Sequence, residues 1–217
     1  MRRGRFITFE GIDGCGKTTQ FHMLATWLRD QGREVVETVE PGGTGIGQQI
    51  RKILLNPENF DLKPRTELLL YFASRAQNVD QVIRPALQAG RIVLCDRFTD
   101  STLVYQGCGR GLDTSAVLEL DRIACQGLKP DTTLLIDIDL ETSLARARRR
   151  NERSERSGRT GPAESRIDDE SVAFHERVRK GYLALAETEP ERFRVIDGRA
   201  AVGEVGLRIR EALQGRV

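Results

Sequence analysis

The sequence has little cysteine, few histidines and almost no excess of charge. Its four cysteines (Cys15, Cys95, Cys108 and Cys125) are dispersed, and only two histidines accompany them. This spacing disfavours a zinc site or a disulfide framework and is typical of free thiols in a reducing cytosol. With 34 basic and 32 acidic residues, the net charge of +2 gives too weak a field for a polybasic nucleic-acid binder. We therefore expect no nucleic-acid partner.

Long apolar runs are also missing. No stretch approaches 18 consecutive apolar residues, and the run from Leu68 to Ala73 is among the longest. After Met1 to Arg5, the apolar stretch is only Phe6 to Phe9 before Glu10 interrupts it, so the sequence predicts no export signal. We expect no membrane partner and a cytoplasmic location.

What is present fits one globular domain over residues 1–217. At 39% hydrophobic and 30% charged residues, a chain of this length buries about 70% of its unfolded surface without disulfides or a structural metal. Arginine supplies 29 of the 34 basic residues. This bias has two interpretations: genomic base composition, or a supply of rigid, bidentate partners for phosphate.

Short β-rich runs alternate with amphipathic helical patterns along the chain. The expected strands are residues 6–10, 35–36, 91–95, 132–137 and 193–196. The expected helices are residues 17–31, 50–56, 65–88, 114–127, 140–150, 168–188 and 202–214, with a loop at 42–47. Strands separated by helices predict an α/β fold, in which a five-stranded parallel sheet is flanked by helices on both faces.

Residues 151–165 break this rhythm. They have no apolar periodicity and contain Gly158, Gly161 and Pro162. From residue 146 to 166 there are eight arginines but only three glutamates, a local net charge of +5. A solvated charged surface explains this run, and so does a mobile arginine-rich lid over about 146–167 that closes on a polyanion.

One motif carries clear chemistry. The run is Gly11-Ile12-Asp13-Gly14-Cys15-Gly16-Lys17-Thr18, followed by Thr19, and it matches G-x-x-x-x-G-K-[ST] between an expected strand and helix. Its glycines let backbone N–H groups converge on phosphate oxygens, and the helix N-terminus adds its positive dipole end. Lys17 is expected to reach the β- and γ-phosphates of ATP, and the Thr18 hydroxyl to coordinate Mg²⁺. The motif indicates a P-loop NTPase-type three-layer fold, but it leaves the acceptor of the γ-phosphate open.

The residues after the third expected strand narrow that choice. A regulatory GTPase requires D-x-x-G after a core strand and N-K-x-D to recognise guanine, and neither is found there. Instead, Asp96 and Arg97 follow the strand. Asp96 can hold the hydration shell of a metal, and Arg97 can bind a second phosphate, which favours an acceptor that itself carries phosphate.

These blocks together resemble the thymidylate kinases, which phosphorylate dTMP with ATP, along nearly the whole chain. The resemblance rests on Phe9 to Thr19, Glu40-Pro41-Gly42-Gly43-Thr44, Gly47, Ile50-Arg51, Phe72-Ala73-Ser74-Arg75, Asp96-Arg97-Phe98, Ser101-Thr102, Tyr105-Gln106-Gly107 and Gly109-Arg110-Gly111. It implies a fold like that of the nucleoside monophosphate kinases, a homodimer, and a lid that closes over ATP.

The resemblance also implies roles in a thymine pocket. Tyr71, where the family usually has Phe, would stack on thymine, although ordinary helix core is the alternative for this side chain. Arg75 would donate to a thymine carbonyl, and Thr102 would lie at the N3 edge. Tyr105 and Gln106 would lie beside the sugar and base, where the tyrosine ring excludes a ribose 2′-OH.

Further family roles concern the acceptor phosphate. Arg51 and Arg97 correspond to the arginines around the dTMP phosphate, and Glu40 and Ser101 belong to the same pocket. Asp13 matches the acidic phosphate-loop residue near the acceptor sugar and the metal, with a turn-stabilising aspartate as the alternative.

Three departures from the family bear on catalysis. Val39 stands where many bacterial members have an arginine near the acceptor phosphate. Gly14 stands where some members have a loop arginine, so transition-state charge must be met from elsewhere. The lid is longer than the short bacterial version, whose end matches Arg166-Ile167-Asp168, and we expect Arg150 and Arg166 to supply the missing charge.

Together these features predict a thymidylate kinase that transfers the γ-phosphoryl of ATP to dTMP, giving dTDP and ADP. The expected catalytic residues are Lys17, Arg97, Asp13, Arg150 and Arg166, with Thr18 and Asp96 as the metal residues. Two alternatives remain open from the sequence: another P-loop nucleotide or nucleoside kinase, and a P-loop ATPase switch that binds a macromolecule.

Overall fold

A computed structural model describes residues 3–146, 149, 166–167 and 170–217. Its centre is a five-stranded sheet in the order β2-β3-β1-β4-β5, with every pairing parallel. The strands are β1 (Arg5–Glu10), β2 (Val35–Val39), β3 (Ile92–Asp96), β4 (Thr132–Asp137) and β5 (Phe193–Asp197). All five predicted strands are confirmed. The second is longer than predicted because Val36 and Thr38 continue the ladder opposite Val93 and Cys95.

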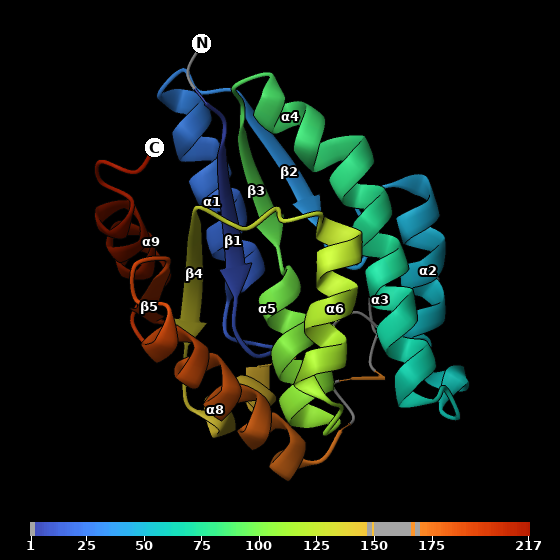
Figure 1. The fold of residues 1–217 in the computed structure, drawn as a ribbon. Coiled ribbons are helices and arrows are strands. Elements are labelled where there is room, and N and C mark those ends of the chain that lie inside the picture. The colour runs from blue at the N-terminus through green and yellow to red at the C-terminus, as the bar shows by residue number, and fades with distance from the viewer. Residues whose placement is uncertain (1–2, 147–148, 150–165, 168–169) are drawn as a thin grey trace.

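Helices cover both faces of this sheet, which gives three layers (Figure 1). They are α1 (Lys17–Asp30), α2 (Gly45–Leu55), η1 (Pro57–Asn59), α3 (Pro64–Asn78), η2 (Val79–Ile83), α4 (Arg84–Gln88), α5 (Thr99–Thr102), η3 (Leu103–Gly109), α6 (Thr114–Cys125), α8 (Val172–Thr188) and α9 (Val202–Ala212). Successive strand residues alternate between faces. Phe6 of β1 therefore packs with α3 and α6, while Ile7 and Phe9 pack with α1 and α9.

The predicted helix at 65–88 is confirmed as α3, η2 and α4, which run end to end through a π-helical turn. The predicted helix at 140–150 is helical over 140–146, and part of its remainder lies outside the described residues. The start expected for the second helix was wrong, because α2 begins at Gly45, where Thr44 caps it by accepting from the Gly47 amide. The predicted loop at 42–47 is therefore shorter than expected, because Gly45 and Gly47 belong to the first turn of α2.

One helical segment was not predicted. Residues 99–109 form α5 and η3, although their small polar side chains show no clear apolar period. Contact between η3 and α8 stabilises this segment. These two elements approach closely because each presents a glycine to the other. A Cβ on Gly109 would lie 2.5 Å from the Phe174 ring, and one on Gly181 would lie 2.9 Å from Cys108 Sγ. Tertiary packing therefore fixes this segment.

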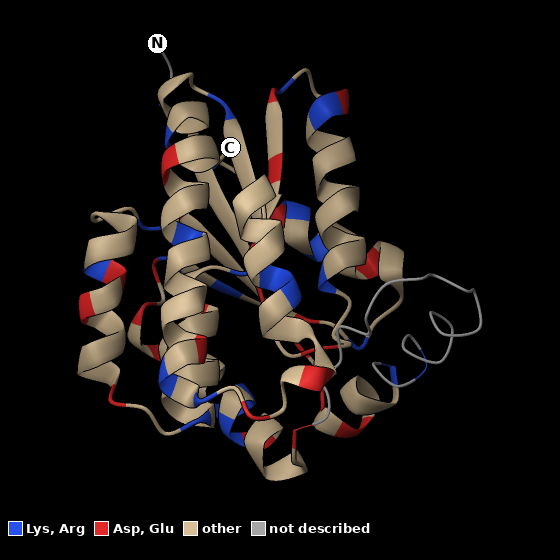
Figure 2. Cartoon of the chain, turned by 90° about the vertical axis from the view of Figure 1, so that its right-hand side faces the viewer, with Lys and Arg blue, Asp and Glu red and all other residues tan. Residues whose placement is uncertain are grey.

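The sheet gathers its acidic residues at one edge. Strands β1, β3, β4 and β5 end in Glu10, Asp96, Asp137 and Asp197. Because parallel strands point the same way, their carboxyl ends meet at one edge, the usual place for ligands in open α/β sheets. Figure 2 shows acidic and basic residues side by side around the lower end of the sheet. In the described ranges, no helix has both the length and the apolarity to cross a membrane.

Candidate active site

The phosphate loop lies between β1 and α1, as the sequence predicted. Gly11, Gly14 and Gly16 have φ values of 135°, 80° and 98°, a region that favours glycine. At Gly11 a Cβ would come within 2.4 Å of the Ile136 carbonyl oxygen. Buried Lys17 folds back so that its Nζ donates to the carbonyl oxygens of Gly11 at 2.9 Å and of Ile12 at 3.1 Å. The loop is held in a shape that suits a phosphate at the start of α1.

The expected metal residues come together at this loop. The Thr18 hydroxyl donates to Oδ2 of Asp96 at 3.4 Å, which joins α1 to the end of β3. Within the part of the chain that the structure describes, no group of three or more His, Cys, Asp or Glu side chains forms a metal cage. One hydroxyl and one carboxylate fit Mg²⁺, because this ion usually keeps several waters and takes oxygens from substrate phosphates.

Arg97 connects the phosphate loop to the second pocket. Its guanidinium donates to Asp13 Oδ1 at 2.7 Å and to the Gly11 carbonyl at 3.1 Å, and it lies 4.9 Å from the ring centroid of Tyr105. The Tyr105 hydroxyl donates to the other Asp13 oxygen at 2.9 Å. Burial lowers the pKa of Arg97, but Asp13, Tyr105, Tyr182 and Asp96 together outweigh this and raise it, so the cation is permanent.

A buried cation marks the second pocket. Arg75 of α3 is 1% exposed, pairs through Nε with Glu40, and donates from NH2 to Thr102 Oγ1 at 2.9 Å and to the Phe98 carbonyl at 3.2 Å. Among the described residues its NH1 atom is buried with no hydrogen-bond partner. Leaving such a donor unpaired costs about 1–3 kcal/mol, so the geometry favours an acceptor supplied by a ligand.

Sequence reasoning missed Asn78, which helps Arg75 to hold Glu40, and Ser74, which holds the neighbouring turn. Asn78 donates from Nδ2 to Glu40 Oε1 at 3.1 Å and accepts from the Thr38 hydroxyl at 2.9 Å, while the Ser74 hydroxyl accepts from the Gly42 amide at 3.0 Å. The peptide bond between Glu40 and Pro41 is cis. Burial raises the pKa of Glu40, and Arg75 opposes that rise. Helical spacing could have signalled Asn78, since it lies one turn after Arg75.

Tyr71 and Arg51 lie at the same pocket. Arg51 donates to the Pro41 carbonyl at 3.0 Å. Burial, and then the charge of Glu67, raise the pKa of Tyr71 to about 12, against the charges of Arg166, Arg97 and Arg51. The phenol is therefore neutral, and the charges of Glu67 and of three arginines act on it.

Gln106 and Arg166 both meet a buried carboxylate that the sequence analysis did not identify. Glu67 of α3 accepts from Gln106 Nε2 at 2.9 Å, from Arg110 at 3.2 Å, and from Arg166. Burial raises the pKa of Glu67, but the hydrogen bonds from Arg110, Gln106 and Arg166, together with the charge of Arg110, outweigh it and lower the pKa. Arg166 also donates to the Leu54 carbonyl. Arg150 and most of the predicted lid lie outside the described residues.

A phosphate loop beside two fixed arginines, Arg75 and Arg97, on a five-stranded parallel sheet defines the nucleoside monophosphate kinase class of P-loop proteins. The family model described as thymidylate kinase matches residues 9–209. The chain belongs to the thymidylate kinase family.

Individual relatives agree with this assignment. A thymidylate kinase from Geotalea uraniireducens is 51% identical over 214 residues, covering 99% of this chain and 98% of that protein. One from Desulfosudis oleivorans is 52% identical over 209 residues, covering 96% of each. The crystal structure of thymidylate kinase from Ehrlichia chaffeensis has a TM-score of 0.76 and 35% identity, covering 98% of this chain and 99% of that one.

Proposed function

We propose that this chain transfers the γ-phosphoryl group of ATP to dTMP, giving dTDP and ADP in dTTP biosynthesis. The observation that carries the proposal is the unpaired NH1 of Arg75, buried beside the Thr102 hydroxyl. A donor and a hydroxyl fixed together recognise the carbonyl and ring N–H of a pyrimidine such as thymine. Family membership supports the same acceptor.

Catalysis in this proposal comes from alignment and charge neutralisation. The phosphate loop and Lys17 hold the donor phosphates, and Arg97 and Arg51 hold the acceptor phosphate. Asp13 fixes the Arg97 guanidinium from one side and receives the Tyr105 hydroxyl from the other. An acceptor phosphate dianion is already nucleophilic, so no dedicated base is required. Mg²⁺, held by Thr18 and Asp96, would neutralise charge between the donor phosphates.

We also propose that the arginine-rich segment acts as a lid. In a single domain of residues 1–217, residues 146–167 would close over ATP, and Arg150 and Arg166 would add positive charge that Gly14 cannot supply. The ion pair of Arg166 with Glu67 supports part of this idea, since it ties the end of that segment to α3 beside Gln106.

We also propose a cytoplasmic homodimer. All four cysteines are free thiols, which fits a reducing compartment. Helices α3 and α6 contact each other and expose apolar side chains, including Leu69, Leu118 and Ile123. Burying them against a second copy of the chain would remove apolar surface from water.

A coupled assay of ADP release tests the proposed reaction across dTMP, dUMP, dCMP, GMP and thymidine. We expect dTMP to give the highest kcat/KM. Better use of thymidine would indicate a nucleoside kinase instead. ATP hydrolysis that no monophosphate changes would indicate an ATPase switch, an alternative that family membership does not favour.

A further inference from the structure

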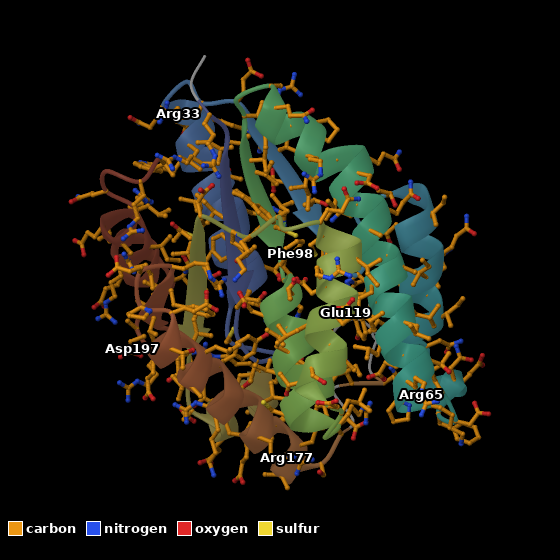
Figure 3. All side chains as sticks on the ribbon, viewed as in Figure 1. Arg33, Arg65, Phe98, Glu119, Arg177 and Asp197 are labelled. Carbon is orange, nitrogen blue, oxygen red and sulfur yellow. The ribbon has the colours of Figure 1, made fainter. Side chains whose placement is uncertain are left out.

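Glu10 is a fully buried carboxylate with no role so far. It is the last residue of β1, 0% exposed, and it accepts three hydrogen bonds. The donors are the Phe98 amide at 2.7 Å, the Ser101 hydroxyl at 2.6 Å and the Tyr182 hydroxyl at 2.7 Å. They come from the turn after β3, from α5 and from α8. Figure 3 places Phe98 in the interior of the molecule, between the sheet and α6.

The same two hydroxyls also bind Arg97. Its NH1 atom donates to Ser101 Oγ at 3.1 Å and to Tyr182 OH at 3.2 Å. A hydroxyl group carries one hydrogen, and an ionised carboxylate can only accept. The two hydroxyls also lie 2.7 Å from each other, and either can be the donor in that contact. An ionised Glu10 draws the hydroxyl hydrogens toward its carboxylate, which turns them away from the guanidinium and leaves hydroxyl lone pairs facing Arg97.

Glu10 acts on the backbone of Arg97 as well. Arg97 has φ of 70°, in the left-handed region where a residue with a side chain is strained. Its own amide donates to the Phe9 carbonyl at 3.0 Å, and the next amide, that of Phe98, donates to Glu10. Phe9 and Glu10, which are consecutive in β1, therefore hold the amides of Arg97 and Phe98.

We propose that Glu10 is a positioning residue that aims Arg97 at the acceptor phosphate, through the Phe98 amide and through the Ser101 and Tyr182 hydroxyls. The inference rests on the proposed function, because it requires a phosphorylated acceptor at Arg97. The other guanidinium nitrogen, NH2, lies 2.7 Å from Asp13 of the phosphate loop, and NH1 also donates to the Gly11 carbonyl of that loop at 3.1 Å. Glu10 never touches substrate in this arrangement.

The ionisation of Glu10 supports this role. Burial, and then the charge of Asp100, raise the pKa of Glu10 to about 7, against the charge of Arg97 and the bonds from Ser101 and Tyr182. Asp100 itself pairs with Arg192 at 2.6 Å. Protonated Glu10 must donate, which turns one hydroxyl hydrogen away from the carboxylate. We expect the hold on Arg97 to weaken as the pH falls through about 7.

Stability should move in the opposite direction. Because folding raises the pKa of this carboxyl from 4.5 to about 7, its contribution favours the folded state most below pH 4.5 and is lost as the pH rises through about 7. A purely structural carboxyl would change the unfolding curve with pH but not turnover. Measuring both on the same protein separates the two roles.

The first test is Glu10→Gln, assayed with ATP and dTMP from pH 5.5 to 8.5. We expect kcat at pH 8 to fall roughly tenfold to a hundredfold, as for other residues that orient a functional group, with KM for ATP unchanged. In a plot of kcat against pH, the rise centred near pH 7 should disappear. A rise near pH 6 that comes from ionisation of the substrate phosphate should stay. Glu211→Gln, at an exposed position of α9, is the matched control and should behave as the wild type.

The second test is Tyr182→Phe, which removes one donor to Glu10 and one acceptor for Arg97. Losing a hydrogen-bond donor to the ionised carboxylate raises the pKa of Glu10 further, so the rise of kcat with pH should move to higher pH. This variant decides the question if Glu10→Gln does not fold. If either variant folds and keeps both the kcat and the pH dependence of kcat of the wild type, the inference is wrong. A wild-type protein that makes no dTDP at any pH would instead overturn the proposed function, and the inference with it.

Discussion

At the scale of single residues, Arg75 carries more than one duty. It neutralises Glu40 in the interior, contacts the rings of Phe72 and Phe98 at 5.0 and 5.2 Å, and has one buried nitrogen, NH1, without a hydrogen-bond partner among the described residues. A buried ion pair contributes little net stability, but removing one partner leaves an uncompensated charge. This pocket is therefore sensitive to small changes.

Arg75→Met should destabilise the fold by about 3–5 kcal/mol, because Glu40 loses its buried cation. It should also abolish discrimination for dTMP among the monophosphates. Urea unfolding and the coupled assay measure the two effects. Arg122→Met is the matched control, since its ion pair with Glu119 is exposed, and it should leave the unfolding midpoint nearly unchanged. An equal loss in both variants would contradict the assignment.

In the proposed mechanism, Lys17 and Arg97 neutralise phosphate charge instead. Replacing either with Met should lower kcat by about a hundredfold to a thousandfold, the range for removing one charge-stabilising donor. Thermal unfolding checks that the fold survives. Lys180→Met, on the exposed side of α8, should keep wild-type turnover. Near-normal kcat in the Lys17 or Arg97 variant would be incompatible with the proposed roles.

At the scale of elements, the close approach of η3 and α8 sets the acceptor side of the site. Element η3 carries Tyr105 and Gln106, while α8 carries Tyr182 and Phe174. A Cβ on Gly109 would meet the Phe174 ring at 2.5 Å, so the spacing of the two elements depends on that glycine. The unpredicted helix thus positions two of the predicted site residues.

Gly109→Ala should cost about 1–3 kcal/mol through overpacking and should raise KM for dTMP by shifting η3. KM for ATP should stay near the wild-type value, because the phosphate loop lies on another element. The control is Gly203→Ala in α9, where a Cβ meets nothing within 4 Å. It should be neutral or slightly stabilising, as expected for alanine in a helix. A destabilisation of equal size in the control would refute this packing argument.

At the scale of the whole molecule, strand order explains how separate segments form one site. Strand β1 lies between β3 and β4, so the phosphate loop after β1 is adjacent to Asp96 and Arg97 after β3. On the other side, Asp137 ends β4 and pairs with Arg179 of α8 through two bonds of 2.7 Å. The donor and acceptor pockets therefore share the carboxyl edge of the sheet.

The proposed dimer is also tested at this scale. Ile123→Glu should place a charge on the apolar surface of α6 and shift the protein to a monomer in sedimentation velocity. Leu207→Glu is the matched control: Leu207 is comparably exposed, at 55% against 60%, but belongs to α9 on the other side of the sheet. If both variants sediment as the wild type, α6 is not the interface.

The sequence by itself determined the parallel α/β fold and the phosphate loop. Both are written in local patterns, namely apolar runs of strand length and glycines at fixed spacing beside Lys17 and Thr18. The tertiary structure alone decided that Glu67 would join Gln106 to Arg166, and that Glu10 would accept from the Ser101 hydroxyl, which in turn accepts from Arg97. Each of these contacts joins segments dozens of residues apart, and a buried carboxylate finds its partners only after the chain has packed.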